Sequence, residues 1–208
     1  MTFEDRAEAG RRLAERLAGL GEDAVVFSIP RGGVEVGAEI ARLRGWTHDI
    51  VVPRKIRAPH NPELGIGAIA PGVRVVDKRM VHALRVTEEY LDGEIGEQEE
   101  EIARRTAAYR AGRPAAQIDG RVVVVVDDGV ATGGTAVAAL RWVREQGARR
   151  VVLAIPVAPA EALARLSKEA DEVICLETPE PFFAVGQWYR RFDQTSDDEV
   201  VRLLGGDR

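Results

Sequence analysis

The chain has 208 residues, of which 45% are hydrophobic and 30% charged, a composition that can bury a core and differs from that of disordered proteins. Its formal net charge of −5 argues against bulk attraction to nucleic acid or anionic lipid, so any phosphate ligand must be held by a local site. A single cysteine, three histidines without metal-ligand spacing and no apolar run of membrane-spanning length lead us to expect a cytoplasmic protein without membrane or nucleic-acid partners.

Helix and strand patterns alternate over the first quarter of the chain. Apolar residues at helical spacing predict a helix over residues 3–20, and a short buried strand is expected over 24–29. A second helix is expected over 34–44, followed by a second strand over 49–52, where Pro53 stops it.

The pattern loosens after residue 53, because prolines and glycines interrupt it up to Gly72. We predict a long loop over Ile56–Gly65 and then a β-hairpin with arms at Ile66–Ala70 and Val73–Val76. A long loop in a compact domain is usually functional or mobile.

A polar helix is expected next. Thr87 can cap a helix that runs to about Tyr109, and the pairs Glu100–Arg104 and Glu101–Arg105 would support it at i,i+4 spacing. Because this segment is too polar for a core helix, we interpret it as a solvated outer helix.

The second half of the chain alternates regularly between strands and helices. Val122–Val126 contains no polar residue, as a central parallel strand buried on both faces requires. The other expected elements are strands over 150–155 and 172–176 and helices over 136–146, 161–170 and 197–204, the last capped by Ser196. This order predicts an α/β fold with an open, mostly parallel sheet flanked by helices.

The strongest chemical signal directly follows the strand at 122–126. Two adjacent carboxylates stand at the carboxyl edge of the sheet, where ligands bind in open α/β folds. Small residues and two threonines come next, and their backbone N–H groups and the following helix N-terminus favour an anion. The carboxylates suit a neighbouring diol or cation, so the segment suits a phosphorylated sugar. Its residues are Asp127, Asp128, Gly129, Val130, Ala131, Thr132, Gly133, Gly134 and Thr135.

Other interpretations of this loop are weaker. It lacks the lysine of nucleoside triphosphatase loops, and the dinucleotide fingerprint G-x-G-x-x-G is absent. An acidic pair in a receiver domain would follow the first strand of a shorter chain. A tight turn with a helix cap, without any ligand, remains the structural alternative.

The string DDGVATGGT resembles the 5-phosphoribosyl 1-pyrophosphate binding motif of type I phosphoribosyltransferases, in a form closest to the adenine-using members. The resemblance implies that Asp127 and Asp128 hold the ribose hydroxyls, while residues 131–135 hold the 5-phosphate. It also implies Mg²⁺ as a cofactor, which Asp127 and Asp128 would reach indirectly, through the ligand or water.

Two further segments resemble parts of the same family. Pro30, Arg31, Gly32 and Gly33 follow the first strand, as the family's pyrophosphate loop does, and Arg54–Lys55 resembles its basic pair after the second strand. The resemblance implies that Arg31 and Lys55 hold the leaving diphosphate and that, with Asp127 and Asp128, they carry catalysis. The segment 56–65 occupies the place of the family's flexible lid.

The segment after the last expected strand resembles the hood of purine members. Phe183 stands just before Val185–Gly186, where an aromatic ring stacks on the base in that family, although a place in the hood core is the alternative. Ala131 replaces an acid that hypoxanthine-guanine members carry, and Arg190 stands where a carboxylate is expected. The base therefore stays open.

Taken together, the resemblance implies a single domain over residues 1–208, with a lid loop and hairpin at 54–76 and a hood and C-terminal helix at 177–208. It implies a Mg²⁺-dependent transferase that moves the phosphoribosyl group to a nucleobase, expected to be a purine, in nucleotide salvage, acting as a homodimer. A regulator that binds the same phosphosugar without transfer, and another phosphosugar reaction on the same fold, are the alternatives.

Overall fold

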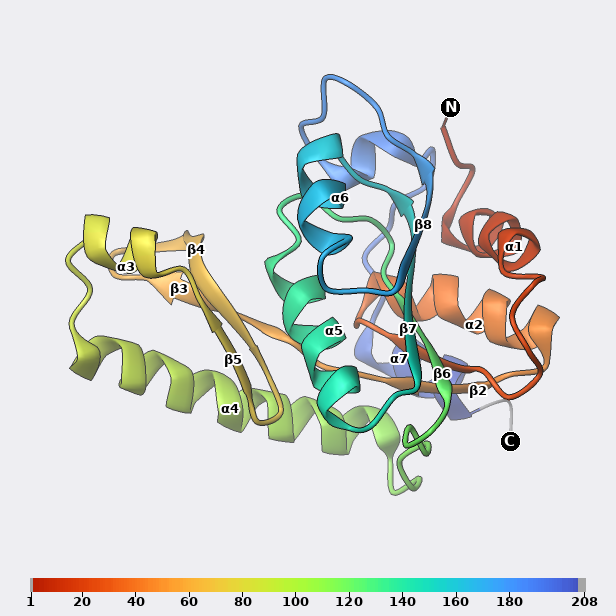
Figure 1. Ribbon diagram of the computed structural model, residues 1–208, viewed down its shortest axis with the longest axis horizontal. Helices are drawn as coiled ribbons and strands as arrows, with labels where there is room; N and C mark the ends of the chain where they lie inside the picture. The colour runs from red at the N-terminus through yellow and green to blue at the C-terminus, as the bar shows by residue number, and fades with distance from the viewer. Residues whose placement is uncertain (1, 206–208) are drawn as a thin grey trace.

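In the computed structural model, which describes residues 2–205, a parallel sheet forms the centre of the molecule (Figure 1). The strand order is β2-β1-β6-β7-β8, and every neighbouring pair is parallel. The expected α/β fold with an open, parallel sheet is confirmed. Its strands are β1 (Val25–Ser28), β2 (Thr47–Ile50), β6 (Val122–Val126), β7 (Arg150–Val157) and β8 (Glu172–Glu177).

Helices cover both faces of this sheet. α1 (Arg6–Arg16) and α2 (Gly32–Arg44) pack on one face, and α5 (Gly134–Glu145) and α6 (Ala160–Leu166) pack on the other, as Figure 1 shows. The valines of β6 alternate between the two resulting cores, which explains why this strand tolerates no polar residue. The carboxyl end of β6 is therefore fixed from both sides.

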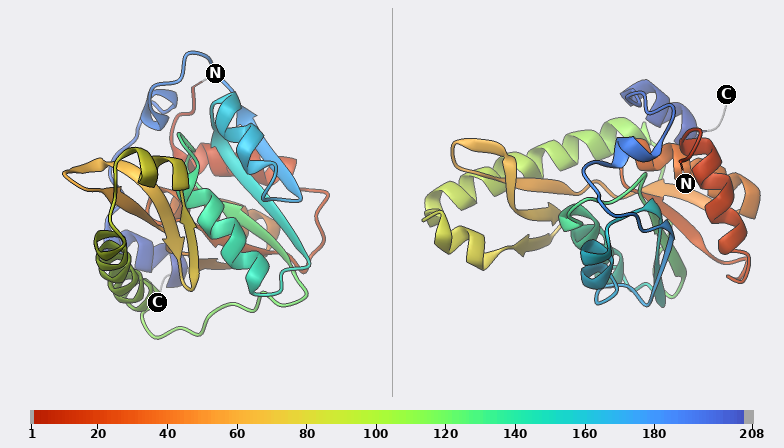
Figure 2. Two further views of the ribbon diagram at one scale, coloured as in Figure 1. Left: turned by 60° about the vertical axis from the view of Figure 1, so that its left-hand side comes forward. Right: turned by 90° about the horizontal axis from the view of Figure 1, so that it is seen from above.

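A second, antiparallel sheet projects from the main body as an arm (Figures 1 and 2). The arm contains β3 (Arg54–Ala58), β4 (Asn61–Ala70), β5 (Val73–Val76) and the short helix α3 (Lys78–Ala83). The long helix α4 (Glu88–Arg110) runs along it and back to the main body, where it meets the last helix, α7 (Asp197–Gly205). A short 3₁₀ helix, η1 (Val185–Trp188), lies between β8 and α7.

The prediction of a long loop over 56–65 is wrong, because most of this segment belongs to β3 and β4. The two strands pair through a ladder with register shifts at Ile56/Arg57 and Arg57/Ala58. Their apolar residues Ile56 and Ile66 are fully buried. Pro59 falls in the turn and Pro62 near the start of β4, two positions where a missing N–H is tolerated. The hairpin expected at 66–70 and 73–76 is confirmed by the β4–β5 ladder.

Two details of the helices also differ from expectation. Helix α3 was not predicted, and α4 is not wholly solvated, because Ile95, Ile102 and Tyr109 are buried against the arm and α7. Thr87 caps α4 as expected, accepting a hydrogen bond from the N–H of Tyr90. The second strand lies at Thr47–Ile50 rather than at 49–52. Within residues 2–205, no helix has both the length and the apolar character needed to cross a membrane.

Candidate active site

Two loops leave the carboxyl edge of the sheet side by side. Ser28 at the end of β1 is paired with Val126 at the end of β6, and the N–H of Ile29 donates to the carbonyl of Val126 over 2.8 Å. Residues 30–33 and 127–133 therefore start from neighbouring points, each leading into a helix N-terminus. The fold brings together the two segments that were predicted from the sequence to bind anions.

The two loops approach each other so closely that glycine is required on one of them. A β-carbon on Gly32 would lie 1.9 Å from Oδ2 of Asp128, and one on Gly33 would lie 2.9 Å from the Cα of Asp127. No side chain fits at either position without moving the acidic pair. The Arg-Gly-Gly segment is thus adapted to close contact with the carboxylates.

The acidic pair is held in surroundings that oppose its charge. Burial raises the pKa of both carboxyls, and repulsion from Asp128 raises that of Asp127 further. The guanidinium of Arg6 counters this at Asp128, where its Nε donates to Oδ2 over 2.8 Å. The hydroxyl of Tyr189 donates to the backbone carbonyl of Asp128 over 2.5 Å. A ligand that supplies hydroxyl donors or a cation would stabilise the ionised pair.

The loop after the pair presents backbone donors to solvent. Val130 anchors it, because its N–H donates to the carbonyl of Val157 over 2.9 Å, while Arg165 donates to the carbonyl of Thr132. Gly133 begins α5 with φ +77, a left-handed conformation that favours glycine. The N–H groups of residues 131–135 find no acceptor among residues 2–205. Free donors at a helix N-terminus make this loop suited to a phosphate.

Arg31 directly precedes α2 and the two glycines that approach the acidic pair. Its Nη1 is 3.5 Å from Oδ1 of Asp197, at the first turn of α7, and its side chain is about one-third exposed. The guanidinium is therefore only loosely held and accessible from solvent.

The basic pair Arg54–Lys55 lies on β3, at the base of the arm. Nε of Arg54 donates to Gln98 on α4, and burial lowers the pKa of this arginine. Lys55 is exposed and donates to the carbonyl of Glu63. It is paired with Ala68, and a β-carbon on Gly134 would lie 4.0 Å from the Cβ of Ala68. Because opposed residues share a face of an antiparallel sheet, Lys55 leaves β3 on the face turned toward the start of α5.

Of the three basic residues predicted to bind the diphosphate, Arg31 alone lies in a loop that touches the acidic pair. No hydrogen bond or ion pair among residues 2–205 joins Arg54 or Lys55 to residues 127–135.

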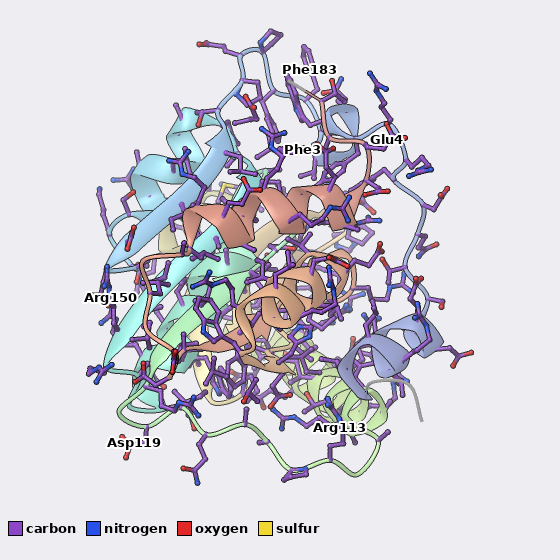
Figure 3. The ribbon with its side chains drawn as sticks, turned by 90° about the vertical axis from the view of Figure 1, so that its right-hand side faces the viewer. Phe3, Glu4, Arg113, Asp119, Arg150 and Phe183 are labelled. Carbon is purple, nitrogen blue, oxygen red and sulfur yellow. The ribbon has the colours of Figure 1, made fainter. Side chains whose placement is uncertain are left out.

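The segment after β8 reaches the same edge of the sheet. A β-carbon on Gly129 would lie 2.5 Å from Cγ1 of Val185, so η1 packs directly on the loop. Phe183 is 76% exposed and lies beyond Phe3 at the outer end of the molecule (Figure 3). A place in the hood core is therefore wrong for Phe183, and its stacking on a base stays a prediction.

Arg6 was not predicted from the sequence, and the structure places it against Asp128. Its side chain is only 6% exposed, although the pattern of α1 is that of an ordinary amphipathic helix. The signal was present, since Arg6 shares helical spacing with the buried Ala9, Gly10 and Leu13. A charged residue on a buried stripe needs a partner elsewhere in the fold.

The chain is similar to proteins of one family. The family model described as "Phosphoribosyl transferase domain" matches residues 3–190. A Mycobacterium tuberculosis H37Rv protein named "Putative phosphoribosyl transferase Rv0571c" is 48% identical over 204 residues, which are 97% of this chain and 46% of that protein. This chain thus spans about half the length of the curated relatives it matches.

Solved structures show the same likeness. The crystal structure of TT1426 from Thermus thermophilus is 45% identical, has a TM-score of 0.82 and covers 98% of both chains. The AQ2163 protein from Aquifex aeolicus, at 15% identity and a TM-score of 0.50 over 87% of this chain and 78% of its own, shares the fold alone.

Proposed function

Since the chain belongs to the phosphoribosyl transferase domain family, we propose that it moves the 5-phosphoribosyl group of 5-phosphoribosyl 1-pyrophosphate to a nitrogenous base, releasing pyrophosphate. One observation carries this proposal. Two loops that lead into helix N-termini meet at one sheet edge, and the two carboxylates of the second loop lie against the glycines of the first. This arrangement suits a ligand with a phosphate, a diol and a diphosphate.

Each part of the ligand has a proposed partner. Residues 131–135 bind the 5-phosphate through their N–H groups and the hydroxyls of Thr132 and Thr135. Asp127 and Asp128 accept hydrogen bonds from the ribose hydroxyls. The N–H groups of Gly32 and Gly33, with Arg31, bind the diphosphate. Lys55 joins them once the ligand is present, since it leaves β3 on the face turned toward α5.

The chemistry asked of these residues is electrostatic. As the bond from ribose C1 to the diphosphate breaks, positive charge develops on the sugar and negative charge on the leaving group. The carboxylates of Asp127 and Asp128 stabilise the positive charge on the sugar. Arg31, Lys55 and the loop N–H groups stabilise the negative charge on the leaving diphosphate. No nucleophilic side chain is required, because a ring nitrogen of the base attacks C1.

Mg²⁺ belongs to the proposal as a cofactor held mainly by the ligand. Among residues 2–205, no group of three or more His, Cys, Asp or Glu side chains could hold a metal ion, and the proposed site contains the pair Asp127 and Asp128. Such a pair fits a hydrated magnesium that the carboxylates contact through water or ligand oxygens. When bound, the ion would neutralise charge on the leaving diphosphate.

The base is proposed to be a purine, with Phe183, which is exposed, stacking on it. The tip of the β3–β4 hairpin is proposed to act as the lid, and residues 177–205 as the hood. A homodimer acting in nucleotide salvage in the cytoplasm completes the proposal. The names of the relatives with 45–48% identity do not specify an acceptor base.

A direct assay tests the transfer. The protein is incubated with 5-phosphoribosyl 1-pyrophosphate, Mg²⁺ and each of a panel of purine and pyrimidine bases, and pyrophosphate release is measured. Release that depends on one base supports the proposal and names the acceptor. Tight binding of the phosphosugar without release with any base would contradict transfer. It would favour the second candidate, a regulator that binds the phosphosugar without transfer.

A further inference from the structure

Arg6 reaches from the first helix to the acidic pair. Its Nε donates to Oδ2 of Asp128 over 2.8 Å, and its Nη1 donates to the carbonyl of Asp193 over 2.7 Å. Its guanidinium also lies 4.0 Å from the centre of the Phe192 ring, and Oε1 of Glu35 is 3.4 Å from Nη1. Contacts with three separate segments hold this side chain in a single orientation.

The contact also bears on the pyrophosphate loop. A β-carbon on Gly32 would lie 2.7 Å from Nε of Arg6 and 1.9 Å from Oδ2 of Asp128, so the Cα of Gly32 rests on the ion pair itself. The Arg6–Asp128 ion pair thus lies at the contact between the 30–33 loop and the 127–135 loop. Removing the guanidinium would free the carboxylate to rotate.

A purely structural role would not require a charge at this position. Buried ion pairs add little net stability, and an apolar side chain of similar volume is often as stabilising. The neighbours of Arg6 on the buried stripe of α1 are alanine, glycine and leucine. What the guanidinium supplies, and a leucine or methionine would not, is a fixed direction for one oxygen of Asp128.

We propose that Arg6 is a positioning residue that fixes the Asp128 carboxylate for recognition of the ribose hydroxyls, an inference that rests on the proposed function. Arg6 acts through Asp128 and not on the phosphate. Loss of Arg6 should therefore lower the affinity for ligands that carry the ribose diol. It should leave unchanged the affinity for ligands held by the phosphate loop alone. This selectivity separates positioning from general support of the fold.

Calorimetric titrations of wild type and Arg6→Met with ribose 5-phosphate, 2-deoxyribose 5-phosphate and inorganic phosphate test the proposal. In Arg6→Met, the affinity for ribose 5-phosphate should fall about tenfold, the effect of one weakened charge-assisted hydrogen bond. The affinity for inorganic phosphate should stay unchanged, and the preference for ribose over 2-deoxyribose should shrink. Arg6→Lys, which keeps the charge, should recover part of the loss.

Two further variants sharpen the result. Arg12→Gln serves as the matched control, since Arg12 lies on the same helix but pairs with Glu177 and should leave all three affinities unchanged. In an Asp128→Asn background, Arg6→Met should have no additional effect on ribose 5-phosphate. An equal loss for inorganic phosphate, an additive effect with Asp128→Asn, or no loss at all would overturn the inference alone. If wild type binds no ribose 5-phosphate, the proposed function falls, and this inference falls with it.

Discussion

At the scale of single residues, the site depends on groups that the fold holds in unfavourable states. Asp127 and Asp128 are adjacent, half-buried carboxyls whose pKa values desolvation raises, and Gly133 adopts a left-handed backbone. The sequence predicted these residues, because carboxylates and glycines follow one buried strand without interruption. Helical spacing indicates that Arg6 is buried, but the sequence could not predict its partner Asp128, which lies 122 positions away.

The left-handed backbone at Gly133 yields a first prediction. Gly133→Val should abolish binding of inorganic phosphate, because a β-branched residue at φ +77 distorts the helix N-terminus and crowds the anion. The matched control is Gly72→Val, with φ +76 and open space around it, in the β4–β5 turn. The control should lose a similar amount of stability, about 1–2 kcal/mol, and keep phosphate binding. Equal phosphate affinity in both variants would show that the anion is held elsewhere.

A second prediction concerns His48, whose side chain contacts Ser28 at the end of β1. Nε2 of His48 lies 2.8 Å from Oγ of the buried Ser28, and burial lowers the pKa of His48 to about 4. Because the folded pKa lies below the unfolded value, folding favours the neutral ring. The contribution of the neutral ring to the free energy of unfolding is complete above about pH 6.5 and is lost as the pH falls toward 4. By pH 5 the loss should be about 2 kcal/mol.

Urea unfolding at pH 7 and pH 5 checks this expectation in wild type and His48→Gln. The difference in unfolding free energy between the two pH values should be smaller in the variant by about 2 kcal/mol. An identical pH dependence in both proteins would mean that His48 titrates normally in the fold.

At the scale of elements, the central sheet followed from local patterns and the arm did not. β6 and the helices around it have clear periodicity, so these elements and a parallel sheet could be predicted, although the strand order could not. β3 and β4 pair irregularly, and β4 contains one proline and two glycines. Both form strands because α4 covers them through Ile95 and Ile102. Such pairing depends on tertiary contacts that a window of sequence does not contain.

The junction of α4 with β3 carries a third prediction. The carboxylate of the buried Glu94 accepts two hydrogen bonds from the guanidinium of Arg57, at 2.7 and 2.9 Å. It accepts a third from the backbone N–H of Arg57. Glu94→Ala would remove the buried acceptor of these hydrogen bonds, costing about 1–3 kcal/mol and speeding amide exchange across β3. Glu97→Ala is the control, since the exposed Glu97 contacts the same arginine and should matter by less than about 1 kcal/mol. Similar exchange rates in both variants would refute this role for Glu94 in the arm.

At the scale of the whole molecule, the start of the described chain pairs with the segment at the end of η1. The N–H of Phe3 donates to the carbonyl of Trp188, and the N–H of Arg190 donates to the carbonyl of Phe3. This places α1 beside the segment that follows η1, so that Arg6 and Tyr189 both reach Asp128. The sequence predicted the fold class and the phosphate loop. It did not predict the backbone pairing of Phe3 with residues 188–190, because this pairing joins segments far apart in the chain.

Binding of 5-phosphoribosyl 1-pyrophosphate by Asp127, Asp128 and the loop after them is the property on which the proposed function depends. Isothermal titration calorimetry with this ligand and Mg²⁺, on wild type and on the double variant Asp127→Asn with Asp128→Asn, tests it most directly. Both substitutions preserve side-chain volume, and thermal unfolding run in parallel should show that the fold persists. We expect clear binding by wild type and none by the double variant. Equal affinity in the two proteins would contradict the proposed role of the acidic pair.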